Sequence, residues 1–189
     1  MRFSERYGHK PVRKMIQVDS MSGELRNSLW NNLTLFIWDK VHTLGYPYGH
    51  TFFEINREME LFCRQLWTRY WKIRLDMLED DWPNVFSEIQ QHFYGCKWFE
   101  VYDFLEFVAS NYPFDTKTAF LTACNKTLQE EGTAYRLVNG LITQITDESE
   151  IAEIESALQH QPGPVQTHLR TALELMSRNL LKNVERHAD

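Results

Sequence analysis

The sequence predicts a mainly α fold, a single-domain helical bundle of about six or seven helices with one small β-hairpin. Apolar residues recur at helical steps of three and four over most of the chain, as Trp98, Val101 and Leu105 illustrate. The composition, 43% hydrophobic and 24% charged over 189 residues, is that of one globular domain. A short segment around Asn139-Gly140 differs and has the pattern of two strands joined by a tight turn.

Two long helices open the predicted bundle. The first covers 21–44, is capped by a residue of segment 19–22, and ends where Pro47 lies between two glycines. The second covers 51–77, keeps one apolar face throughout, and is long enough to be the central helix.

Three shorter helices follow, over 81–95, 97–111 and 115–132. Asp81 is expected to cap the first of them, with Pro83 in its first turn. Glycine or proline ends each one, because neither residue continues a helix readily.

The rest of the chain divides into a hairpin, a short acidic helix that ends at about residue 159, and a terminal helix. The hairpin is expected at 133–145, and Pro-Gly-Pro at 162–164 is the strongest linker signal. We therefore expect a helical domain over 1–160 and a separate C-terminal helix within 161–189.

Several classes of protein are disfavoured by what the sequence lacks. It has no apolar run of about 20 residues, so we expect no membrane partner. It opens with charged residues rather than a secretory signal, which favours a cytoplasmic location. Cys63, Cys96 and Cys124 are far apart in apolar patterns, as expected of reduced core thiols. With no clustered metal ligands, phosphate loop or nucleophile motif, we expect no metal, no cofactor and no catalytic residues.

Basic residues gather in two stretches, one at the N-terminus and one interleaved with Trp67, Tyr70 and Trp71. Cations beside aromatic rings suit phosphate contact and base stacking. The aromatic residues also have core spacing, so the cations have a second interpretation as a solvated helix face. The residues considered for nucleic-acid binding are Arg2, Arg6, His9, Lys10, Arg13, Lys14, Arg64, Arg69, Lys72 and Arg74.

Two motifs near the N-terminus resemble those of a known family. They read Phe3-Ser4-Glu5-Arg6-Tyr7-Gly8 followed by Pro11, and Leu25-Arg26-Asn27-Ser28-Leu29-Trp30-Asn31. With them, the chain resembles the AbiJ N-terminal domain 4 family of bacterial abortive-infection proteins. The motif residues are Phe3, Ser4, Glu5, Arg6, Gly8, Pro11, Arg26, Asn27, Trp30 and Asn31.

The resemblance implies a role in antiviral defence against phage, in a module usually followed by a HEPN helical region. That class includes metal-independent ribonucleases, which use an Arg and a His a few positions later. In this sequence His187 lies farther from Arg178 than the ribonuclease motif allows. Arg2 and His9 have the spacing of that motif, but we expect them to lie in a non-helical arm. We therefore expect no activity in this chain alone, and interpret 161–189 as a remnant of a HEPN-type region.

Three hypotheses about function follow. The first is a phage-defence sensor or regulatory module that recognises RNA or a phage or host protein. It would form a homodimer through helix 165–186, whose apolar stripe has few later elements to cover it. The second is a HEPN-like ribonuclease or RNA-binding protein, with Arg2, Arg6, His9, Arg64 and Arg69 lining a groove. The third is an antitoxin-like partner of a separately encoded effector.

Overall fold

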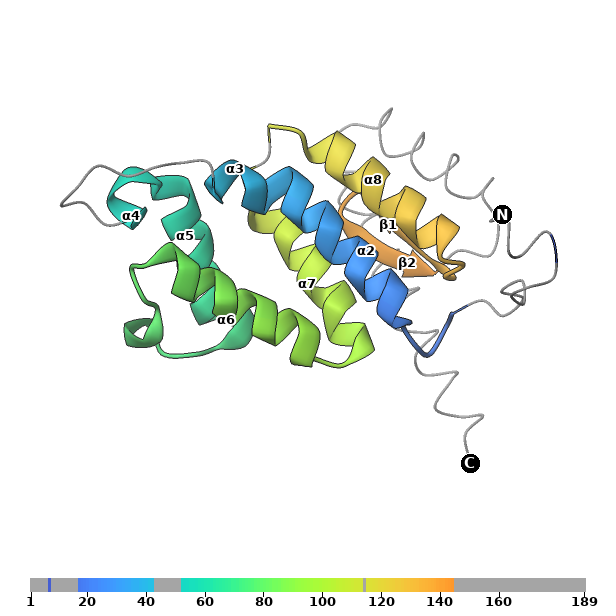
Figure 1. The fold of residues 1–189 in the computed structure, drawn as a ribbon, viewed down its shortest axis with the longest axis horizontal. Helices are drawn as coiled ribbons and strands as arrows, with labels where there is room; N and C mark the ends of the chain where they lie inside the picture. The colour runs from blue at the N-terminus through green and yellow to red at the C-terminus, as the bar shows by residue number, and fades with distance from the viewer. Residues whose placement is uncertain (1–6, 8–16, 43–51, 114, 145–189) are drawn as a thin grey trace, which may run out of the picture.

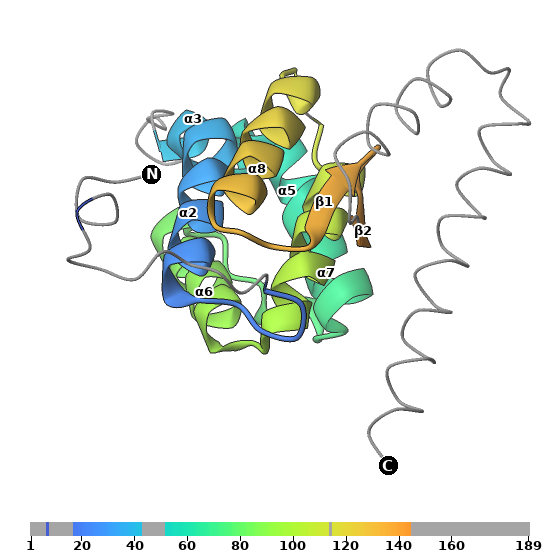
Figure 2. The same ribbon diagram turned by 90° about the vertical axis from the view of Figure 1, so that its right-hand side faces the viewer.

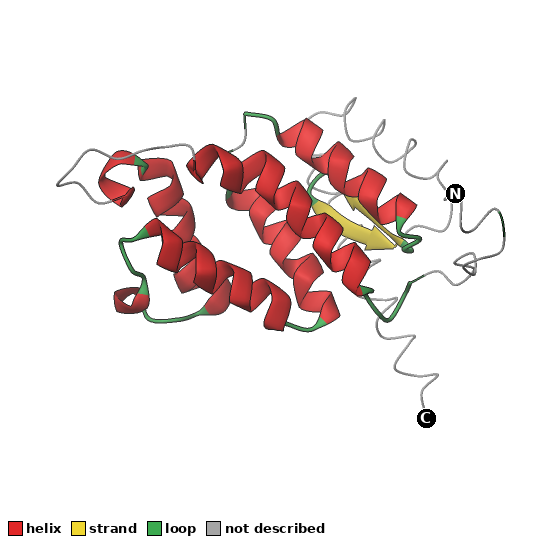
Figure 3. Ribbon diagram, in the orientation of Figure 1, coloured by secondary structure: helices red, strands yellow, loops and turns green. Residues whose placement is uncertain are grey.

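The structure, a computed structural model, describes residues 7, 17–42, 52–113 and 115–144. In this part the fold is mainly α, with one two-stranded antiparallel hairpin, as predicted (Figure 1; Figure 3). The elements are α2 Gly23–Leu33, η1 Thr34–Trp38, α3 Asp39–His42, α4 Phe52–Ile55, α5 Arg57–Gln65, η2 Leu66–Trp71, η3 Leu75–Met77, α6 Trp82–Gly95, α7 Trp98–Asn111, α8 Lys117–Glu130, β1 Tyr135–Val138 and β2 Leu141–Gln144. The helix expected at 165–186 lies outside the described residues.

The first predicted helix is confirmed as the continuous run of α2, η1 and α3. The Ser22 hydroxyl caps it by accepting a hydrogen bond from the Leu25 amide at 3.1 Å. Its middle part, η1, is a π-helix, and the adjacent Ile37 and Trp38 are both fully buried there. This run lies between α6 and α8 (Figure 1; Figure 2).

The single long helix predicted over 51–77 is wrong. Asn56 interrupts it between α4 and α5, because its side chain accepts a hydrogen bond from the Met59 amide at 3.1 Å and starts a new helix. The π-helix η2 then ends at Lys72, whose φ of 54° is left-handed. The apolar positions stay in phase across the first break, so their spacing did not reveal it.

The three shorter helices are confirmed as α6, α7 and α8, within two residues of the predicted bounds. Pro83 lies in the first turn of α6, but the Asp81 side chain makes no capping hydrogen bond. The next helix, α7, does have a side-chain cap, because a Glu100 carboxylate oxygen accepts a hydrogen bond from the Lys97 amide at 2.6 Å. After α8, Gly132 takes a φ of 66°, as expected for a C-terminal glycine.

The predicted hairpin is confirmed, with Tyr135 opposite Gln144 and Asn139-Gly140 in the turn. Both turn residues have positive φ, 51° and 86°. The Asn125 side chain fixes β1 to α8, since it donates to the Leu137 carbonyl at 2.8 Å and accepts from the Leu137 amide at 2.7 Å. The two strands therefore pack on the helices rather than standing alone (Figure 2).

Gln17 joins the chain before α2 to the loop between α8 and β1. Its backbone pairs with that loop, accepting from Ala134 at 3.2 Å and donating to Gly132 at 2.9 Å. Its side chain donates to the Glu131 carbonyl at 2.7 Å and accepts from the Ser22 amide at 2.6 Å. We call this set of contacts the Gln17 clasp.

Aromatic rings fill the interior between α2, α5, α6 and α7. Trp30 is 6% exposed, and its ring centroid lies 5.0 Å from that of Phe93. Trp82 stacks on Phe52 at the same distance, with an angle of 28° between the rings. None of the helices in the described ranges is long and apolar enough to cross a lipid bilayer.

Candidate functional site

Two adjoining hollows lie on the surface around α6 and the start of α7. One, of about 750 Å³, follows the outer side of α6, and the other, of about 330 Å³, lies between η2, α6 and α7. His92, Cys96 and Glu100 line both, so the hollows meet at these residues. We call the pair the α6–α7 groove. Its other lining residues are Tyr70, Trp71, Glu79, Asn84, Ser87, Glu88, Gln91, Phe93, Gly95, Asp103 and Phe104.

A stacked ring pair stands where the two hollows meet. The His92 imidazole lies 4.1 Å from the Trp71 ring centroid, with an angle of 23° between the ring planes. Trp71 is the last residue of the π-helix η2, and the left-handed Lys72 that follows turns the chain away from it. The His92 Nε2 also lies 3.9 Å from a carboxylate oxygen of Glu88, one turn earlier on α6.

The groove is electrostatically negative. Its charged lining residues are acidic, namely Glu79, Glu88, Glu100 and Asp103, and no lysine or arginine of the described ranges lines either hollow. The pKa of Asp103 is raised, first by partial removal from water and then by the neighbouring Glu100. These two carboxylates also add to the raised pKa of Tyr70, which is due mainly to burial.

Arg26 holds the end of α6 that forms this groove. Its guanidinium donates four hydrogen bonds of 2.9–3.0 Å, to the carbonyls of Phe93, Tyr94 and Cys96. The last carbonyls of a helix lack partners within the helix and carry its negative dipole end, so a cation there is favourable. The position of His92 and Cys96 therefore depends on a residue of α2.

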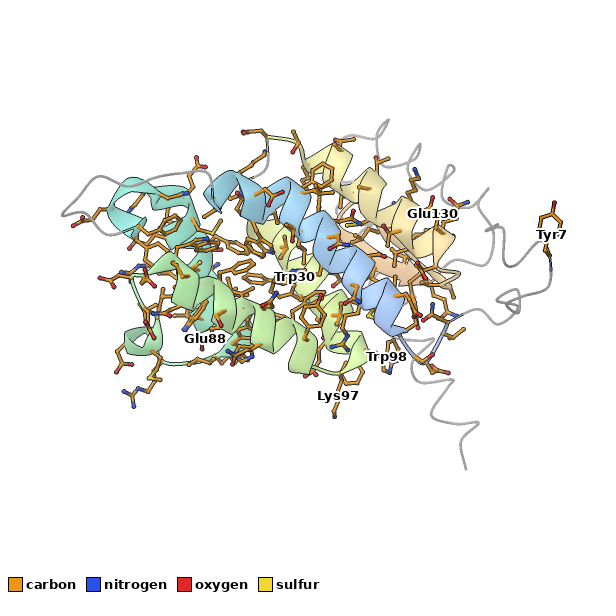
Figure 4. The ribbon with its side chains drawn as sticks, in the orientation of Figure 1. Tyr7, Trp30, Glu88, Lys97, Trp98 and Glu130 are labelled. Carbon is orange, nitrogen blue, oxygen red and sulfur yellow. The ribbon has the colours of Figure 1, made fainter. Side chains whose placement is uncertain are left out.

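The motif at 25–31 therefore serves the fold in part, because two of its residues hold the end of α6. Arg26 binds the end of α6, and Trp30 packs under the same turn, with its ring 5.7 Å from that of Tyr94 (Figure 4). Asn27 and Asn31 are exposed on the outer side of α2. The sequence model of AbiJ N-terminal domain 4, a family of abortive-infection proteins, matches residues 1–160, which include this motif and the groove.

The chain belongs to the AbiJ N-terminal domain 4 family. The resemblance seen in the sequence is therefore confirmed, and it places the chain in abortive-infection defence against phage. No curated protein and no solved structure matches the chain. The first motif of this AbiJ domain, with Phe3, Ser4, Glu5, Arg6, Gly8 and Pro11, lies outside the described residues.

The basic residues considered for nucleic-acid binding are not brought together by the described structure. Arg64 pairs with Glu60 at 2.7 Å, and Arg74 pairs with Asp76. Arg69 and Lys72 are exposed at the end of η2. The N-terminal candidates Arg2, Arg6, His9, Lys10, Arg13 and Lys14 lie outside the described ranges.

The aromatic residues beside these cations have other roles in the AbiJ domain. Trp67 is fully buried, so the base-stacking role considered for it is wrong. The Tyr70 hydroxyl donates to the Glu100 carbonyl at 2.9 Å, and its ring packs 5.2 Å from that of Phe107. The core interpretation of this aromatic stretch therefore holds for Trp67, whereas Trp71 also faces the groove.

The cysteines are free thiols, as predicted. Burial raises the pKa of Cys63, and it raises the pKa of Cys124 to about 12. Cys96 is half-buried, and its Sγ donates to the Phe93 carbonyl at 3.3 Å. At neutral pH all three are held as thiols, which are poor nucleophiles.

Sequence reasoning missed the groove. Spacing along α6 gives His92 the neighbour Glu88, one turn earlier, whose carboxylate oxygen lies 3.9 Å from its Nε2, but it does not point to a groove. The partner that matters is Trp71, which comes from another helix, so only the three-dimensional fold brings the two rings together. Within the described ranges, no three histidine, cysteine, aspartate or glutamate side chains are grouped so as to hold a metal ion.

Proposed function

We propose that this AbiJ domain is a sensor or regulatory module of phage defence, and that it acts by binding a protein through the α6–α7 groove. The observation that supports this is the groove itself, a hollow lined by a stacked Trp71–His92 pair and by carboxylates. Concave surfaces that combine aromatic and a few polar groups are typical binding sites. Family membership supplies the biological setting.

A protein partner fits the groove better than a nucleic acid does. Carboxylates repel the phosphate backbone, which provides most of the affinity in protein–nucleic acid complexes. Of the described basic candidates, Arg64 and Arg74 are each engaged by a carboxylate, and the exposed Arg69 and Lys72 line neither hollow. RNA binding or cleavage through Arg6 and His9 remains a separate hypothesis. It can be tested by incubating wild type, Arg6→Ala and His9→Ala with total RNA in the absence of metal ions.

Phage challenge of bacteria that express the chain together with its neighbouring genes tests the proposal. We expect fewer plaques on cells that express the wild-type chain than on cells that lack it. At high phage multiplicity, the culture that expresses the chain should collapse early. The groove variant is the double substitution Glu88→Gln and Asp103→Asn, which removes two charges without changing side-chain size. We expect this variant to lose most of the protection.

The control variant is Glu130→Gln on α8. Glu130 and Glu88 are matched, since each pairs with a residue on its own helix at 3.9 Å, Lys126 and His92 respectively. They lie on opposite sides of the domain in Figure 4. Protection by the groove variant equal to that of wild type would contradict the proposal, and so would full loss of protection in Glu130→Gln.

A further inference from the structure

We infer that the α6–α7 groove binds the guanidinium group of an arginine in a basic segment of the partner protein, between the Trp71–His92 rings and the groove carboxylates. This inference rests on the proposed function, which makes the partner a protein. It adds the chemistry of the contact, and hence the kind of sequence that the partner must present.

The aromatic wall is the first reason. Trp71 and His92 are nearly parallel, and the half-buried Tyr70 and the largely buried Phe104 also line the smaller hollow. A guanidinium is planar and weakly hydrated, so it packs well against aromatic rings, whereas a lysine ammonium retains more of its water. Half-buried aromatic side chains on a hollow surface are also typical anchors of protein interfaces.

The distribution of charge is the second reason. Carboxylates from two helices lie near the ring pair: Glu88 beside His92 on α6, and Glu100 and Asp103, one turn apart on α7, in the lining of the smaller hollow. Partial burial raises the pKa of Asp103, and the Glu100 carboxylate raises it further, because two neighbouring negative charges disfavour each other. A cation bound between them would relieve this repulsion. Arginine can also donate two parallel hydrogen bonds to one carboxylate.

The Arg26 guanidinium, which binds the end of α6, does not fill this role. Arg26 is committed to the carbonyls of Phe93, Tyr94 and Cys96 at the end of α6. It is not among the residues that line either hollow. None of the described lysines and arginines lines either hollow, so we assign the charge complement of the groove to the partner.

Fluorescence anisotropy with short labelled peptides tests the inference on the full chain. The probes are octa-arginine, octa-lysine and octa-glutamate at low salt. We expect octa-arginine to bind at least about threefold more tightly than octa-lysine, because only arginine gains from the ring wall. The groove variant should weaken octa-arginine binding about tenfold, which corresponds to about 1.4 kcal/mol. Glu130→Gln should leave it unchanged, and octa-glutamate should not bind.

Two results would overturn the inference: equal affinity of wild type and groove variant for octa-arginine, or equal affinity of wild type for octa-arginine and octa-lysine. Thermal unfolding of each variant verifies that the fold is retained, as expected for isosteric changes at the surface. The phage assay separates the two proposals. Loss of protection without arginine-selective binding refutes only the arginine assignment. Full protection by a variant with weakened peptide binding refutes the proposed function and leaves the arginine site standing.

Discussion

Replacing Arg26 by alanine should destabilise the domain by about 2–3 kcal/mol. The side chain makes four hydrogen bonds to three carbonyls at the end of α6. A hydrogen bond to a charged group contributes about 1.5–3 kcal/mol, and a cation at a helix C-terminus about 0.3–1 kcal/mol. The full sum is not expected, because these carbonyls are only partly buried and water replaces the guanidinium at some of them.

Urea unfolding followed by circular dichroism measures this loss. At this chain length it corresponds to a fall in Tm of about 5–10 °C. Arg26→Lys should lose about half as much, since lysine keeps the charge but cannot reach three carbonyls with one planar group. Arg69→Ala, at an exposed position on η2, is the matched control and should change stability by less than about 0.5 kcal/mol. If the unfolding free energy of Arg26→Ala is within that same margin of wild type, the hydrogen bonds of Arg26 to the end of α6 do not stabilise the domain.

Three further expectations concern pH, backbone strain and assembly. The pKa of Glu60 is lowered, mainly by the hydrogen bond from Arg64. The charged form of Glu60 therefore stabilises the fold at pH values above the ordinary pKa of a glutamate, and this stabilisation is lost as the pH falls through the lowered pKa. Glu60→Gln should therefore flatten the loss of stability below about pH 4.5 in urea titrations, and an unchanged acid slope would argue against this pair. Gly140→Ala should cost about 1–2 kcal/mol because its φ is 86°, whereas Gly95→Ala should be nearly neutral because an added Cβ meets nothing within 4 Å; equal effects would exclude backbone strain as the cause. The homodimer expected through 165–186 predicts twice the monomer mass in sedimentation at tens of micromolar, and a monomer alone would contradict it.

Local signals in the sequence were enough to predict much of the fold. Alternation around Asn139-Gly140 gave the hairpin, and proline and glycine marked the ends of α6 to α8. The break at Asn56 was hidden, because the apolar residues on either side of this N-cap keep their helical spacing. The π-turns of η1 and η2 have no comparable sequence signal.

The candidate site was harder to predict than the fold. His92 and Trp71 are 21 positions apart, so neither spacing nor composition links them. The role of Arg26 was hidden for the same reason: its partners are backbone carbonyls about 70 positions away, and any residue type offers those. The family motif includes Arg26, but the sequence alone does not predict that its guanidinium binds the carbonyls at the end of another helix.

The Gln17 clasp has a mechanical consequence. Gln17 and the start of β1 are tied together, and Gln144 pairs with Tyr135, whose hydroxyl donates to the Val18 carbonyl at 2.8 Å. The two ends of the described helical domain, near Gln17 and Gln144, are therefore held close together by hydrogen bonds. Because the Gln17 side chain also accepts from the Ser22 amide, the same contacts fix the start of α2, four residues before Arg26.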